Sequence, residues 1–61
     1  QFRKSLFVVK DVMAGEKFTT KNVRSIRPGQ GLAPKHYHEV IDRQAAINID
    51  RGTPLEWNLI K

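Results

Sequence analysis

The chain contains a weak internal repeat. Residues 10–23 (KDVMAGEKFTTKNV) and 47–60 (INIDRGTPLEWNLI) align without a gap, with Gly15 opposite Gly52. Apolar positions coincide on both sides of the shared glycine: Val12 with Ile49, Phe18 with Leu55 and Val23 with Ile60. The alignment predicts two copies of one unit, each made of a strand, a glycine turn, a short strand and a helical turn.

One segment between the two copies has no counterpart. It comprises residues 25–32, with the sequence SIRPGQGL. If the repeated halves form the scaffold, the specific chemistry of the chain belongs in the part that is not repeated. We therefore expect the functional residues in this segment.

The size of the chain limits its function. A chain of 61 residues forms one domain and buries only about 60% of the surface that its unfolded form exposes, so it has little room for an enclosed active site. The absence of cysteine excludes disulfides and thiolate metal sites, and it is compatible with the cytoplasm, where we expect the protein to act. No apolar run approaches the ~20 residues of a membrane helix. Because the sequence starts at Gln1 and not at Met, we interpret residues 1–61 as a domain excised from a longer chain.

The net charge of +5 raises the question of nucleic-acid binding. The eleven Lys and Arg residues are dispersed and never form a run longer than two. The repeat also assigns most aromatic residues to the core, whereas nucleic-acid modules expose aromatic side chains for stacking. We expect no nucleic-acid partner, and a basic nucleic-acid-binding module stays an alternative.

The pattern predicts a mainly β domain with short helical turns. Residues 33–41 form the best helix, because Pro34 suits a first helical position and Tyr37, Val40 and Ile41 share one face. Asp42 closes this helix, since Asp tolerates a left-handed conformation. The other expected elements are strands at 5–9 and 45–50, extended segments at 24–27 and 54–55, turns at 13–16 and 51–52, and helical turns at 21–23, capped by Thr19 or Thr20, and at 56–60.

Signatures of catalysis are missing. His36 and His38 are two residues apart on the expected helix, so they point to different faces and do not suit a helical metal pair; we interpret them as surface residues. Ser5 and Ser25 have no neighbouring base, and no pair of carboxylates has acid/base spacing. We predict no catalytic residue and no metal ligand in this chain.

The unrepeated segment suits ligand contact. Pro28 fixes one dihedral angle, while Gly29 and Gly31 permit sharp reversals and close approach of another backbone, so the loop can be rigid and protruding. Arg27 stands at its base with a planar fork of donors suited to a carboxylate, a phosphate or an amide carbonyl. The alternative is that Arg27 only satisfies carbonyl groups of the adjacent turn or is a solvated charge.

The sequence resembles the C-terminal antifreeze-like domain of the sialic acid synthase family over essentially its whole length. The resemblance rests on SLFVVKDV (5–12), the Gly15-Glu16 pair, NVRSIRPGQGL (22–32), Pro34-Lys35 and GTPL (52–55), and the RPGQGL segment is its most specific part. It implies a SAF-type module of the β-clip fold with an internal pseudo-twofold repeat. Asp42 departs from the family pattern, which often has glycine there.

The resemblance also implies a function. Members of the family condense phosphoenolpyruvate with an N-acylated hexosamine, using a divalent metal such as Mn or Mg in an N-terminal (β/α)8 barrel that is absent here. The antifreeze-like domain stabilises a domain-swapped homodimer and covers the barrel of the partner subunit. An arginine of the RPG segment, here Arg27, reaches the acylamino group of the sugar, and Arg24 is its near neighbour in the sequence. On this basis the isolated domain is non-catalytic.

The similarity to type III antifreeze proteins of fish adds ice binding as a second alternative. Those proteins present a flat and uncharged surface around their first repeat unit. The corresponding region here carries charged residues, which are strongly hydrated and poor templates for ice: Lys10, Asp11, Glu16, Lys17 and Lys21.

Overall fold

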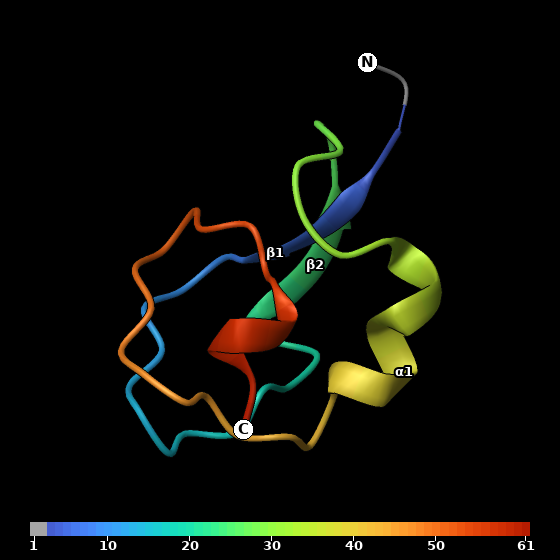
Figure 1. The fold of residues 1–61 in the computed structure, drawn as a ribbon. Coiled ribbons are helices and arrows are strands. Elements are labelled where there is room, and N and C mark those ends of the chain that lie inside the picture. The colour runs from blue at the N-terminus through green and yellow to red at the C-terminus, as the bar shows by residue number, and fades with distance from the viewer. Residues whose placement is uncertain (1–2) are drawn as a thin grey trace.

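The computed structural model describes residues 3–61 and shows a small, mostly extended chain with a helical segment at residues 34–40 and a short C-terminal turn at residues 57–59 (Figure 1). Its elements, in chain order, are β1 (Ser5–Val8), β2 (Val23–Ile26), the 3-10 helix η1 (Pro34–His36), α1 (Tyr37–Val40) and the 3-10 helix η2 (Trp57–Leu59). This agrees with the predicted mainly β class with short helical turns.

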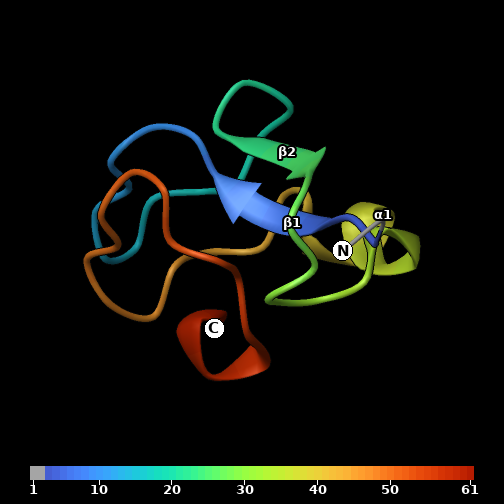
Figure 2. The ribbon, with the colours of Figure 1, turned by 90° about the horizontal axis from the view of Figure 1, so that it is seen from above.

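The two strands form a two-stranded antiparallel sheet. Phe7 pairs with Arg24, and Leu6 pairs with Ser25. All four residues of β1 are buried, whereas only Val23 is buried in β2. Seen from above, β2 lies on the outer side of β1, away from the C-terminal turn (Figure 2). β1 is therefore the central strand and β2 an edge.

Isolated pairings join the remaining extended segments. Val12 and Ile49 exchange two backbone hydrogen bonds, with N···O distances of 2.9 and 2.7 Å. Several other bonds recur at the offset that separates Gly15 from Gly52. Gly15 N–H donates to Ala45 O and Gly52 N–H to Val8 O, both at 2.8 Å. The two turns are also held alike, since Ala14 N–H donates to the Asn48 side chain and Arg51 N–H to the Asp11 side chain.

Both turn glycines have positive φ, 86° for Gly15 and 91° for Gly52, as the predicted turns at 13–16 and 51–52 require. The core lies between the two halves and includes each apolar residue that the sequence alignment paired. Its members are Leu6, Val8, Val12, Phe18, Val23, Leu32, Val40, Ala45, Ile49, Leu55 and Ile60. The β-clip topology and the twofold repeat themselves stay predictions at this point.

Three predicted elements differ from the structure. The predicted helix 33–41 is a 3-10 turn followed by one α turn, with Pro34 at the first position as expected and Tyr37 and Ile41 packed on the core. The predicted helical turn 21–23 is shifted, because Val23 already belongs to β2; Thr19 caps this turn through a bond from Lys21 N–H. The predicted strand 45–50 is wrong.

Residues 45–50 form no continuous strand because their backbone partners change from residue to residue. Ala45 N–H donates to Glu16 O, Ala46 N–H to Leu59 O and Ile49 N–H to Val12 O. The segment passes from one hydrogen-bonding partner segment to the next and therefore does not pair continuously with any one of them. Asp42, by contrast, adopts the predicted left-handed conformation with φ of 74°. Within the described residues, the helices are too short to cross a membrane.

Candidate functional site

The unrepeated loop follows β2 at one end of the molecule, beside the start of β1 and far from the C-terminus (Figure 1). Arg27 and Pro28 are exposed, and the peptide bond between them is cis. The chain returns to the core at Leu32, whose N–H donates to Leu55 O and whose carbonyl accepts from Leu6 N–H, both at 2.9 Å. The loop is thus tied at its far end to β1 and to the extended segment at residue 55, while Arg27 is exposed.

Ser5 holds the middle of the loop. Its side chain is fully buried, and its hydroxyl donates to the Pro28 carbonyl at 3.0 Å and accepts from Gln30 N–H at 3.1 Å. The same amide lies 3.1 Å from the Pro28 carbonyl. One hydroxyl on the central strand therefore joins two backbone groups of the loop. The sequence-based reasoning considered Ser5 only as a nucleophile and missed this role.

The two loop glycines lie close to other segments of the same chain. A Cβ at Gly31 would lie 2.5 Å from Leu55 O and 3.0 Å from Pro54 Cβ, and a Cβ at Gly29 would lie 2.7 Å from Arg3 Cβ. A Cβ atom does not lie closer than about 3.0 Å to such neighbours, so a side chain at either position would force the neighbouring atoms to shift. Gly31 in particular allows the loop to lie directly on the backbone of residues 54–55. This is the close approach for which the sequence predicted glycine.

A surface hollow of about 450 Å³ lies beside the loop, where β2 faces the helical segment. Its lining residues are Thr20, Val23, Arg24, Ser25, Pro34 and Tyr37. The hollow therefore contains Arg24, whereas Arg27, Pro28, Gly29 and Gly31 do not line it. The two arginines, three positions apart in the sequence, therefore differ in their relation to the hollow: Arg24 lines it and Arg27 does not. No signal in the sequence pointed to this hollow, because its lining comes from two separated segments, residues 20–25 and 34–37.

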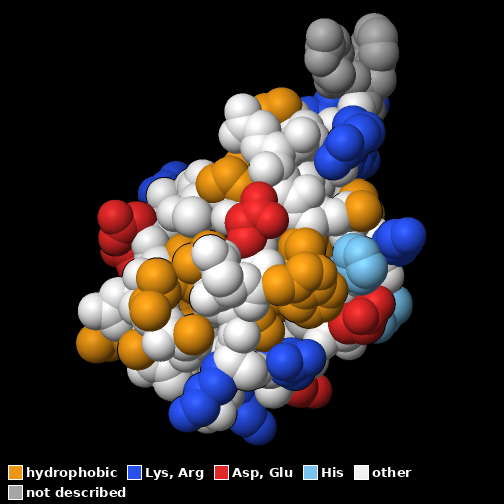
Figure 3. Space-filling model, viewed as in Figure 1, with side chains coloured by type: hydrophobic (Ala, Val, Ile, Leu, Met, Phe, Trp, Pro, Cys, Tyr) orange, Lys and Arg blue, Asp and Glu red, His pale blue; other side chains and the backbone are white. Residues whose placement is uncertain are grey.

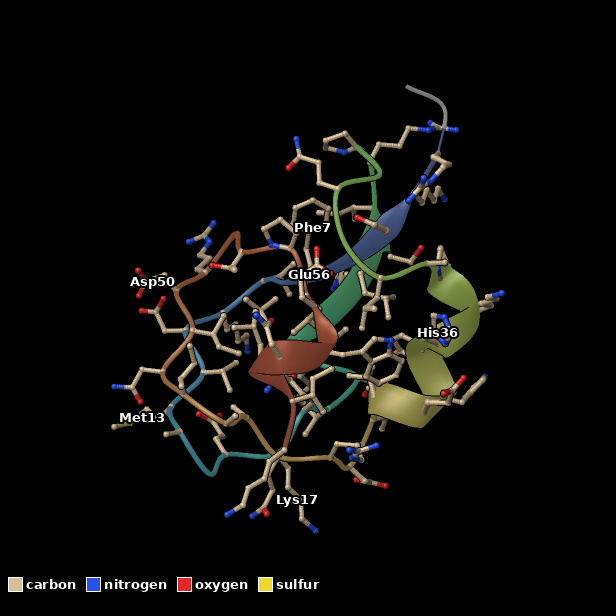
Figure 4. All side chains as sticks on the ribbon, viewed as in Figure 1. Phe7, Met13, Lys17, His36, Asp50 and Glu56 are labelled. Atoms are coloured by element: carbon tan, nitrogen blue, oxygen red, sulfur yellow. The ribbon has the colours of Figure 1, made fainter. Side chains whose placement is uncertain are left out.

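The helical segment contacts the C-terminal turn through His36 (Figure 4). Its ring packs edge-on against Trp57 with ring centroids 5.3 Å apart, and Nδ1 lies 3.0 Å from Glu39 Oε2. His36 is half-buried in this arrangement and is not the plain surface residue that the sequence suggested. His38 is exposed and lies beside the Tyr37 ring. The two histidines have different surroundings, as their spacing predicted.

The surface of the described residues is mixed in character. Hydrophobic side chains gather over the centre of one face, while Lys and Arg side chains occur around its rim (Figure 3). The large apolar side chains with the greatest exposure are Met13, Ile26, Ile47 and Trp57. Among residues 3–61 there is no group of three His, Cys, Asp or Glu side chains that could hold a metal ion.

Comparison with known proteins identifies relatives over nearly the whole chain. The family model described as "SAF domain" matches residues 3–61. The chain is 43% identical over 54 residues to the pseudaminic acid synthase of Helicobacter pylori, covering 88% of this chain and 16% of that protein. It is 27% identical over 59 residues to the N,N'-diacetyllegionaminic acid synthase of Legionella pneumophila, covering 97% of this chain and 17% of that protein.

Solved structures give the same picture. The chain superposes on the spore coat polysaccharide biosynthesis protein spsE of Bacillus subtilis with a TM-score of 0.89 and 26% identity, over 95% of this chain and 17% of that one. A putative spore coat polysaccharide biosynthesis protein E of Chromobacterium violaceum gives a TM-score of 0.79, also at 26% identity, over 97% of this chain and 18% of that one. These matches confirm the family resemblance drawn from the sequence. The chain spans about a sixth of the length of these relatives.

Proposed function

The chain belongs to the SAF domain family, and on that premise we propose that it covers the substrate site of a sialic-acid-type synthase and contacts the sugar through Arg27. In this proposal the synthase condenses phosphoenolpyruvate with an N-acylated hexosamine in the cytoplasm. The domain is inactive alone, stabilises a homodimer by domain swapping and lies over the (β/α)8 barrel of the partner subunit. Nucleic acid and membrane are not partners in it.

The observation that carries the proposal is the anchored loop. Ser5 holds the Pro28 carbonyl and the Gln30 amide, and Gly31 lies on the backbone at Leu55, while Arg27 stays exposed. An ordered loop loses little conformational entropy when its arginine engages a ligand. A guanidinium donates well to the carbonyl oxygen of an acylamino group. The loop would orient the acceptor sugar and exclude water, which accelerates a reaction by positioning.

The repeated scaffold supports the β-clip part of the proposal. The bonds Phe18 N–H to Arg43 O and Leu55 N–H to Leu6 O stand at equivalent places in the two halves, as do those made by Gly15 and Gly52. Hydrogen bonds that exchange between two halves in this way are the pattern expected for a pseudo-twofold axis. We place that axis at the Val12–Ile49 pair, because this pair joins equivalent residues of the two halves.

A metal in the parent enzyme would be bound outside this chain. The described residues offer no group of three suitable side chains, so they do not fit the Mn or Mg ion that the family resemblance implies. No step assigned to this domain passes through a metal. Its own contribution is restricted to Arg27 and to the residues that shape the loop.

The test is Arg27→Ala in the full-length parent enzyme, assayed for condensation of phosphoenolpyruvate with N-acylated hexosamines. We expect a loss of kcat/KM of tenfold or more with the dimer intact by size-exclusion chromatography. Arg51→Ala is the matched control, because Arg51 is also exposed but lies in the glycine turn at 51–52. Near-normal kinetics of Arg27→Ala would refute the substrate contact and reduce the domain to a structural cover.

A further inference from the structure

The hollow beside β2 has the size of a binding site for a small molecule. Its volume of about 450 Å³ lies within the roughly 300–1,000 Å³ of ligand pockets. Val23 and Pro34 supply apolar wall, and the other four lining residues carry polar groups. It is separate from the Arg27 loop, so an inference about it is independent of the function proposed above.

The polar groups of the hollow are available for a ligand. Arg24 supplies a guanidinium, while Thr20, Ser25 and Tyr37 supply hydroxyls. Within residues 3–61, these four side-chain groups take part in none of the side-chain hydrogen bonds or ion pairs of the structure. By contrast, the Ser5 hydroxyl in the neighbouring strand is fully engaged. Four residues with polar side chains, one of them cationic, therefore border one hollow.

The backbone of β2 adds further groups. In an antiparallel pair, hydrogen-bonded and non-hydrogen-bonded positions alternate. The N–H of Leu6 donates to Leu32 O, and its carbonyl accepts from Leu55 N–H. Leu6 and its partner Ser25 are therefore a non-hydrogen-bonded pair. The N–H and C=O of Ser25 consequently point away from β1 toward the open edge of the sheet. Ser25 and its neighbours Val23 and Arg24 in β2 are lining residues of the hollow.

The charges around the hollow favour an anion. Lys21 and Lys35 are exposed and follow the lining residues Thr20 and Pro34 directly in the sequence. Glu39 is the acidic residue of the adjoining helical segment, and its carboxylate is engaged with His36. Arginine is suited to bidentate bonds with carboxylate or phosphate, and hydroxyls pair with the hydroxyls of a polyol.

We propose that this hollow binds a small polyhydroxylated ligand that carries an oxyanion, such as a sugar acid or a sugar phosphate. Arg24 binds the oxyanion. Ser25, Thr20 and Tyr37 bind the hydroxyl groups, and Pro34 with the Tyr37 ring contacts the apolar C–H face of the ligand. The oxyanion is a carboxylate in one case and a phosphate in the other, and a titration distinguishes them.

The experiment is an NMR titration of the ¹⁵N-labelled 61-residue chain. The probes are N-acetylneuraminic acid, ribose 5-phosphate, neutral N-acetylglucosamine, acetate and inorganic phosphate. We expect saturable shifts of the amide signals of Thr20, Ser25 and Tyr37 with one or both of the anionic sugars. A response to N-acetylneuraminic acid identifies a carboxylate site, and a response to ribose 5-phosphate identifies a phosphate site. Absence of both responses would overturn the proposal.

Matched variants separate a built site from general attraction to a cation. Arg24→Gln should weaken binding at least tenfold, whereas Arg51→Gln, at an exposed arginine far along the chain, should leave it unchanged. Tyr37→Phe, which keeps the packed ring, should weaken binding by a smaller factor. Equal binding of acetate or inorganic phosphate would show only non-specific anion binding, and equal binding of neutral N-acetylglucosamine would show no role for the oxyanion; either result would overturn the proposal.

This test is distinct from the test of the proposed function. Arg27 does not line the hollow. If Arg27→Ala had normal kinetics in the parent enzyme, the proposed function would fail, but the result of the titration would not change. Conversely, an unresponsive hollow leaves the loop assignment intact. The two arginines therefore report on two sites.

Discussion

The paired turns and the unrepeated loop both depend on glycine, but for different physical reasons. Gly15 and Gly52 have positive φ, and a Cβ at either position would meet nothing within 4 Å. At Gly31 and Gly29 φ is not in the left-handed region, and a Cβ would lie 2.5 Å from Leu55 O and 2.7 Å from Arg3 Cβ, respectively. The turns need glycine for backbone conformation, whereas the loop needs it for space. An added methyl group should therefore strain the backbone in a scaffold turn but collide with neighbouring atoms in the loop.

The largest expected effect is that of Gly31→Ala. The added methyl group meets backbone atoms of Leu55, which cannot rotate away, so the Leu32 N–H to Leu55 O bond must lengthen or break. We expect a loss of about 3 kcal/mol in the free energy of unfolding, as for overpacking combined with a lost bond. Urea unfolding of the 61-residue chain followed by Trp57 fluorescence measures it. A loss below about 1 kcal/mol would contradict the steric argument.

If Gly31→Ala does not fold, the comparison between loop and turn glycines can still be tested at Gly29. Arg3 is exposed and its guanidine end is flexible, although its Cβ is also close to the position of the added methyl group. Gly29→Ala should therefore cost less than Gly31→Ala. An equal or greater cost would show that contact with the Leu55 backbone is not the dominant constraint on the loop.

Gly15→Ala and Gly52→Ala should each have an intermediate effect. With open space around both positions, the cost is only that of a left-handed conformation, about 1–2 kcal/mol. Asparagine tolerates this conformation better and should cost less than alanine at both positions. Thermal and urea unfolding of the four variants provide the measurement. Clearly unequal costs of the two alanine variants would argue against equivalent halves.

The sequence predicted the features that depend on local chemistry. The two glycine turns, the left-handed Asp42, Pro34 at a helix start and the buried apolar residues of the repeat all follow from residue type and spacing, and all are present. The alignment of the halves also anticipated that Val12 and Ile49 would have equivalent surroundings. Such features need no knowledge of distant parts of the chain.

The features that the sequence missed depend on contacts between distant segments. The strand expected at 45–50 fails because its amides bond to Glu16, Leu59 and Val12 in turn. The hydrogen bonds of Ser5 are made with residues more than twenty positions away, and the hollow combines residues of two separate segments, 20–25 and 34–37. The Arg27 loop was selected because it lacked a repeat, and its role in substrate binding stays a prediction.

Ser5→Ala should have a smaller effect than the alanine variants of the glycines, and it tests how the loop is held. Removing the hydroxyl leaves the Pro28 carbonyl and the Gln30 amide without that partner, but both residues lie near the surface, where water can replace it. A loss of about 1 kcal/mol is expected, typical of one net hydrogen-bond contribution. Ser25→Ala, which removes a hydroxyl without such bonds, should change stability by less than about 0.5 kcal/mol.

Hydrogen exchange separates a local role of Ser5 from a general loss of stability. If Ser5 holds the loop, the Gln30 amide should exchange faster in Ser5→Ala by a larger factor than the core amide of Val12, which bonds to Ile49 in both proteins. If both amides changed by the same factor, the hydroxyl would stabilise only the whole domain. In the parent enzyme the local effect should raise KM for the acylated sugar, because a loosened loop presents Arg27 less well, and an unchanged KM would separate loop order from substrate binding.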